Sequence, residues 1–212
     1  MQVAIALFPR LTALDAIGPY EVLQRVPALD VVFVGAQRGE VRTENGFLGL
    51  SVDATFDEVP APDVVLMPGG VGNRELLDGG PCIDWIRSTY ATTRFTTSVC
   101  SGSLVLAAAG LLTGLTATSH WGVLPYLEQL GAVPVTQRVV EHLPERLITA
   151  AGVSAGIDMA IRLVELLVDE VSAQAAQVMI EYDPHPPFDA GHPSKVSSAV
   201  MERVVEHAEV RA

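Results

Sequence analysis

Cysteine, basic residues and long apolar runs are scarce in this chain, and each shortage excludes a class of protein. Two cysteines among 212 residues cannot build a disulfide scaffold, so we expect a reducing compartment, the cytoplasm. The chain has 13 basic and 25 acidic residues and a net charge of -12. This charge argues against binding to nucleic acid or to an anionic membrane. No apolar run reaches the roughly 18 residues of a membrane-spanning helix, and the N-terminus lacks the basic start of a signal peptide.

Motifs for cofactors are missing as well. No P-loop is present, and no G-x-G-x-x-G follows an expected strand, so nucleotide binding is not expected. The five histidines are scattered without the spacing of zinc ligands. We therefore expect neither a metal nor an organic cofactor, and we expect a small molecule as the binding partner.

Hydrophobic residues make up 49% of the chain, which indicates a packed globular fold of a size suited to one domain. Short apolar runs alternate with longer amphipathic ones. This alternation predicts an α/β fold in which a mostly parallel sheet is covered by helices on both faces. The main expected strands are residues 2–8, 29–35, 64–67, 94–99 and 147–150. The main expected helices are residues 16–26, 83–92, 104–109, 154–170, 172–182 and 194–210.

The end of the chain differs from the rest in composition. Residues 184–193 are rich in proline, and such a stretch cannot form regular structure. We therefore expect a single domain, 1–212, in which residues 184–212 form a C-terminal arm and helix.

Residues 94–110 are the most informative stretch for chemistry. A strand rich in β-branched residues ends at Val99, and a Leu/Ala-rich helix begins near Leu104. The tight turn between them holds Cys100 at a strand-to-helix corner, a position that carries nucleophiles in other proteins. The amides at the start of the helix are expected to lower the pKa of the thiol. The alternative is that Cys100 is a small buried core residue.

Two further features are expected at the same sheet edge, because ligands of parallel sheets bind where the strands end. Gly69 and Gly70 follow the strand at 64–67. Their amides and that of Ser101 could donate to a developing anion, or the glycines could form an ordinary turn. Asp15 follows the first strand. Burial would raise the pKa of its carboxyl and let it carry a proton, although Asp is also a common helix N-cap.

Two other residues have a functional and a structural interpretation. His120 could act as a base for Cys100, but a core or helix-capping histidine is the simpler interpretation. Cys82 lies at a helix start away from the expected sheet edge, so we expect it to be structural.

Together these stretches resemble the ThiJ/PfpI superfamily, whose fold is a flavodoxin-like three-layer sandwich. The resemblance covers nearly the whole chain, and the most similar branch is that of the isocyanide hydratases. The motifs that carry it are Phe8-Pro9, Leu14-Asp15, Gly18-Pro19, Pro68-Gly69-Gly70, Ser98-Val99-Cys100-Ser101-Gly102, Ser119-His120-Trp121 and Ala151-Gly152.

The resemblance implies that Cys100 is a nucleophile and that Asp15 is the acid that hydrogen-bonds it and moves protons. It implies a lyase that hydrates isocyanides to N-substituted formamides, and a homodimer. Ser101 stands where the hydratase branch has Thr and where the superfamily's proteases have His, which weakens a protease function. The alternatives on this scaffold are glyoxalase or deglycase activity, redox sensing at Cys100, and a ligand-sensing domain without catalysis.

Overall fold

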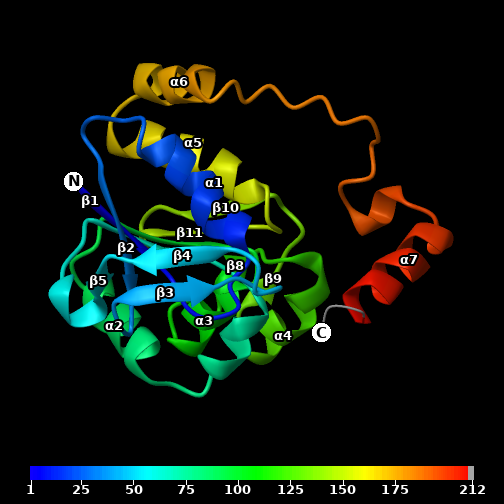
Figure 1. Ribbon diagram of the computed structural model, residues 1–212, viewed down its shortest axis with the longest axis horizontal. Coiled ribbons are helices and arrows are strands. Elements are labelled where there is room, and N and C mark those ends of the chain that lie inside the picture. The colour runs from blue at the N-terminus through cyan, green and yellow to red at the C-terminus, as the bar shows by residue number, and fades with distance from the viewer. Residues whose placement is uncertain (210–212) are drawn as a thin grey trace. The chain divides into compact units, whose positions relative to one another are not determined.

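The structure, a computed structural model, describes residues 1–209 (Figure 1). Its strands are β1 (Gln2–Ala6), β2 (Asp30–Gly35), β3 (Gly39–Arg42), β4 (Gly49–Val52), β5 (Ala54–Thr55), β6 (Val64–Met67), β7 (Phe95–Val99), β8 (Thr116–Ala117), β9 (Val133–Pro134), β10 (Val139–His142) and β11 (Leu147–Ala150). Its α-helices are α1 (Ala13–Leu23), α2 (Pro81–Tyr90), α3 (Gly102–Ala108), α4 (Leu124–Gln129), α5 (Ala155–Leu167), α6 (Glu170–Met179) and α7 (Ser198–Glu209). Short 3-10 helices are η1 (Phe56–Glu58), η2 (Val71–Glu75), η3 (Trp121–Val123) and η4 (Pro193–Lys195).

The central sheet has seven strands in the order β10-β11-β7-β6-β1-β2-β5. All neighbours are parallel except β10 and β11, which form an antiparallel pair at one edge. Every residue of β6 is fully buried, as are residues 3–6 of β1. Their continuous apolar sequences suit strands that are covered on both faces.

Helices cover both faces of this sheet, so the fold is the expected flavodoxin-like three-layer sandwich. The helices α1, α5 and α6 pack together on one face, and α2, α3 and α4 lie on the other (Figure 1). In the middle of the sheet β1, β6 and β7 are neighbours, so the loops that follow them meet at one edge.

The first helix differs from its expected bounds. It begins at Ala13, three residues before the expected start, so Pro19 lies inside the helix and not in its first turn. Proline has no N–H, so the carbonyl of Asp15 lacks its usual partner one turn later. A β-carbon on Gly18 would lie 3.1 Å from the Ile157 side chain, which shows how closely α1 and α5 pack.

The described chain divides into two compact units, Met1–Ile180 and a second that begins at Glu181. In the second unit, residues 181–192 contain no helix or strand, as their proline content predicts. The terminal helix was expected at 194–210, but α7 starts only at Ser198 and a separate 3-10 turn, η4, precedes it. The expected last residue of this helix, 210, lies outside the described residues. Within residues 1–209 no helix combines the length and apolar character needed to cross a bilayer.

Candidate active site

Cys100 occupies the corner between β7 and α3. Its φ of 58° lies in the left-handed region, which is unusual for a residue with a side chain. Backbone and side-chain hydrogen bonds fix this conformation: its N–H donates to the carbonyls of Ala150 and Ala151 at 3.1 Å, and its carbonyl accepts from Ser119 Oγ at 2.9 Å. Two residues on, a β-carbon at Gly102 would lie 2.1 Å from the Met67 carbonyl oxygen, so only glycine fits there.

Asp15 lies on α1 with its carboxyl fully buried. Its Oδ2 accepts a hydrogen bond of 2.9 Å from the Gly69 N–H, and Oδ1 has no hydrogen-bond partner within the described chain. The N-cap interpretation is wrong, because Thr12 occupies the N-cap of α1 and Asp15 reaches across to the loop after β6. Burial raises the pKa of Asp15 to about 7 against the smaller opposing effects of Gly69 and the Cys100 thiol, which confirms the expected direction.

The Cys100 thiol behaves differently from the expectation. Burial, the larger cause, and the nearby charge of Asp15 together raise its pKa to about 12, although the N–H groups of Val153 and Ser101 act to lower it. The expected lowering by the helix start is wrong, because only 6% of Cys100 is exposed and desolvation of a thiolate outweighs two amide donors. Above pH 7 the pair therefore holds one proton, which resides on sulfur next to a carboxylate.

The two glycines after β6 hold Asp15 and Ser101 in place through backbone hydrogen bonds. The Gly70 N–H donates to Ser101 Oγ at 2.9 Å, and Asn73 Nδ2 donates to the same oxygen at 3.1 Å. A β-carbon on Gly69 would lie 2.6 Å from the Ser101 nitrogen and 2.8 Å from Asp15 Oδ2. The amides of Gly69 and Gly70, expected to stabilise an anion, thus donate to Asp15 and Ser101 within the protein.

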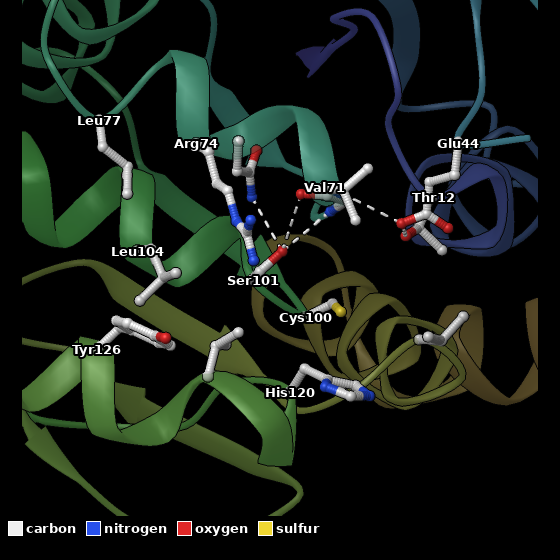
Figure 2. A pocket seen from close by; sticks show the side chains of 14 residues that line it. Thr12, Glu44, Val71, Arg74, Leu77, Cys100, Ser101, Leu104, His120 and Tyr126 are labelled. Carbon is white, nitrogen blue, oxygen red and sulfur yellow. Dashed lines mark hydrogen bonds between the residues drawn. The ribbon is translucent and has the colours of Figure 1, made fainter. Parts of the chain in front are cut away.

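A pocket of about 580 Å³ opens above the sulfur (Figure 2). Within the described chain no three His, Cys, Asp or Glu side chains gather as metal ligands would. Most of the exposed surface of the pocket wall is apolar, with several polar side chains set into it, as in many small-molecule sites. The lining residues are Thr12, Glu44, Gly70, Val71, Asn73, Arg74, Leu77, Cys100, Ser101, Leu104, His120, Val123, Tyr126 and Val153.

Residues 1–166 match the DJ-1/PfpI family. The chain belongs to this family. Over 208 residues it is 43% identical to an isonitrile hydratase from Pseudomonas putida. The match covers 98% of this chain and 90% of that protein. A crystal structure of a ThiJ/PfpI family protein from Pseudomonas syringae has a TM-score of 0.91 and 35% sequence identity, covering 99% of this chain and 87% of that one. A deglycase from Pyrococcus horikoshii is 27% identical over 128 residues, 59% of this chain and 76% of that protein.

In this member of the DJ-1/PfpI family His120 lines the pocket, but no hydrogen bond within residues 1–209 joins it to Cys100. Its Nδ1 accepts from the Gly122 N–H at 3.2 Å and caps η3, which confirms the capping interpretation. Burial lowers the pKa of His120, so the ring is neutral at pH 7. With Nδ1 accepting, the neutral ring carries its proton on Nε2.

Sequence reasoning missed several residues of the site, among them Asn73, Val153 and Glu44. Asn73 holds the Ser101 hydroxyl, and the Val153 N–H faces the sulfur. Glu44 lines the pocket, where its Oε1 accepts from Thr12 Oγ1 at 2.8 Å and from the Val71 N–H at 3.3 Å. These contacts join segments that are distant in the chain, and no local motif marks them.

Proposed function

We propose that this protein hydrates isocyanides to N-substituted formamides, with Cys100 as the nucleophile and Asp15 as the proton carrier. The observation that carries the proposal is the buried pair itself: a thiol and a carboxyl of pKa about 7 in contact at the base of a mostly apolar pocket. The 43% identity to an isonitrile hydratase over nearly the full chain supports the choice of substrate.

In the first step the thiol adds across the terminal carbon of the isocyanide. The Cys100 sulfur forms a bond to that carbon while Asp15 takes the thiol proton. Asp15 then delivers the same proton to the carbon, giving a thioimidate, Cys–S–CH=N–R. A carboxyl with a pKa near 7 can accept and release a proton at neutral pH, and both transfers need this.

In the second step water adds to the C=N bond. The Asp15 carboxylate accepts one proton from the water as the water oxygen bonds to carbon, and it passes that proton to the nitrogen, giving Cys–S–CH(OH)–NH–R. As the C–S bond breaks, the hydroxyl proton passes through Asp15 to the sulfur, and R–NH–CHO leaves. The Val153 and Ser101 N–H groups face the sulfur and stabilise the negative charge that develops on it as the C–S bond breaks.

Infrared spectroscopy tests the proposal directly. The isocyanide stretch of an aryl isocyanide is followed with the wild type and with Cys100→Ala, and the formamide is identified as the product. We expect loss of the band with the wild type only. A parallel assay offers methylglyoxal, since one relative is a deglycase; turnover of methylglyoxal with no loss of isocyanide would overturn the proposal.

We further propose that the protein acts as a homodimer in the cytoplasm. The C-terminal unit exposes several apolar side chains, which is typical of surfaces that bind a protein partner. They are Phe188, Val200, Val204 and Val205. Light scattering of the full chain across a dilution series tests this, and a monomer mass at every concentration would contradict it.

A further inference from the structure

The pocket contains one positively charged side chain, that of Arg74 on η2. Within residues 1–209 its guanidinium makes no hydrogen bond, ion pair or ring contact. Apart from Arg10, every other arginine in that range has such a partner. In a chain with 25 acidic residues, an arginine that lines the pocket without a carboxylate partner is available to a ligand.

The side chains around Arg74 indicate how an anionic ligand would be oriented in the pocket. Arg74 points from η2 into the pocket, and the apolar side chains of Leu77 and Leu104 line the same side (Figure 2). Glu44 lies on the opposite side, beyond Val71 (Figure 2). The Glu44 carboxylate is held by protein donors, so it does not neutralise Arg74. An anion therefore finds attraction on the Arg74 side and repulsion on the other.

We infer that the preferred substrates are isocyanides that carry a carboxylate at the far end of an apolar chain. The inference rests on the proposed function and specifies its substrate class. The isocyanide carbon lies at Cys100, the apolar chain runs along Leu77 and Leu104, and the carboxylate pairs with Arg74. The planar guanidinium matches a carboxylate through two parallel N–H donors. Hydration adds water across the isocyanide group and leaves the carboxylate unchanged.

The kinetic test uses a matched pair of substrates, an aliphatic ω-isocyanocarboxylate and its primary amide. For the wild type we expect kcat/KM to be about fivefold higher for the acid, the size of effect that a partly solvated charge pair gives. In Arg74→Gln this ratio falls to about one, while Arg74→Lys keeps part of it. Arg10→Gln removes the same charge from a residue outside the pocket lining and keeps the full ratio.

A binding test separates this inference from the proposed function. The Cys100→Ala protein is titrated calorimetrically with the N-formyl acid and with its amide, so that no turnover is needed. We expect tighter binding of the acid, and loss of that preference when Arg74→Gln is added. Equal binding of acid and amide, or a preference that survives Arg74→Gln, would overturn the inference. If no isocyanide is consumed but the Arg74-dependent preference remains, the proposed function fails and the anion site stands.

Discussion

Cys82 and Cys100 are alike in burial and in the pKa of the thiol, and they differ in what surrounds the sulfur. Each is 6% exposed, and burial raises the pKa of each thiol to about 12. Cys82 is the second residue of α2 and burial alone accounts for its raised pKa. Cys100 has a left-handed backbone, the Asp15 carboxyl beside it, two amides facing its sulfur and an open pocket.

The comparison shows that a buried thiol becomes a candidate nucleophile through its partners. A thiol with a pKa near 12 is almost wholly protonated at neutral pH, and a protonated thiol is a poor nucleophile. In the proposed mechanism Asp15 removes the proton of Cys100 as the sulfur attacks, whereas burial is the only cause acting on the pKa of Cys82. Loss of Asp15 should therefore change both turnover and stability, and the two sulfurs should differ in reactivity.

The largest effect is expected from Asp15→Asn, which leaves Cys100, like Cys82, without a carboxylate beside its thiol. Turnover of an isocyanide should fall by roughly a thousandfold, the middle of the range that general acid–base catalysis contributes. In the wild type kcat/KM should rise with pH to a plateau above about pH 7, because the carboxylate form of Asp15 accepts the thiol proton. Steady-state rates from pH 5 to 9 measure both effects, with Cys82→Ala as the control that retains wild-type rates.

The same substitution should stabilise the fold. Burial raises the pKa of Asp15 from 3.8 to about 7, so the stability it contributes is fully present below pH 3.8 and is lost as the pH rises through 7. At pH 8 the folded protein holds a buried carboxylate, and Asp15→Asn relieves it by on the order of 2 to 4 kcal/mol. Denaturant titrations at pH 8 and pH 4 measure this. A gain at pH 4 as large as that at pH 8 would contradict the assigned pKa.

The smallest effect is a difference in labelling rate between the two cysteines. Iodoacetamide should modify Cys100 about tenfold faster than Cys82, because Cys100 lines the pocket above and has the Asp15 carboxyl beside it, whereas Cys82 does not line that pocket. Peptide mass spectrometry after timed quenching gives both rates in one sample. In denaturant the two rates should become equal; equal rates in the folded protein would remove the distinction between the two sites.

The sequence predicted the parts of the site that depend on local pattern. The apolar strands, the glycines after β6 and the corner at Cys100 were visible in the residues, and the rule for parallel sheets brought Asp15, Gly69 and Cys100 to one edge. The hydrogen bond between the Gly69 N–H and Asp15 confirms that convergence.

What the sequence could not give depends on distances across the fold. The pKa of Cys100 is set by competition between amide donors and desolvation, and only the burial of the sulfur decides which is larger. The helix-cap alternative for Asp15 arose because its sequence neighbours are helical, whereas its hydrogen-bond partner lies 54 residues away. Asn73, Val153 and Arg74 join the site through the packing of loops, for which no local pattern exists.

The left-handed backbone at Cys100 also bears on how this protein can evolve. Glycine adopts that backbone freely and a residue with a β-carbon does not, so the fold alone would favour glycine at this position by about 1 kcal/mol. In a duplicated copy that no longer needs the thiol, replacement of Cys100 by glycine would therefore increase the stability of the fold. Relatives that keep a side chain at this corner do so because its function is under selection. A relative with glycine at this position is therefore expected to have lost the original activity.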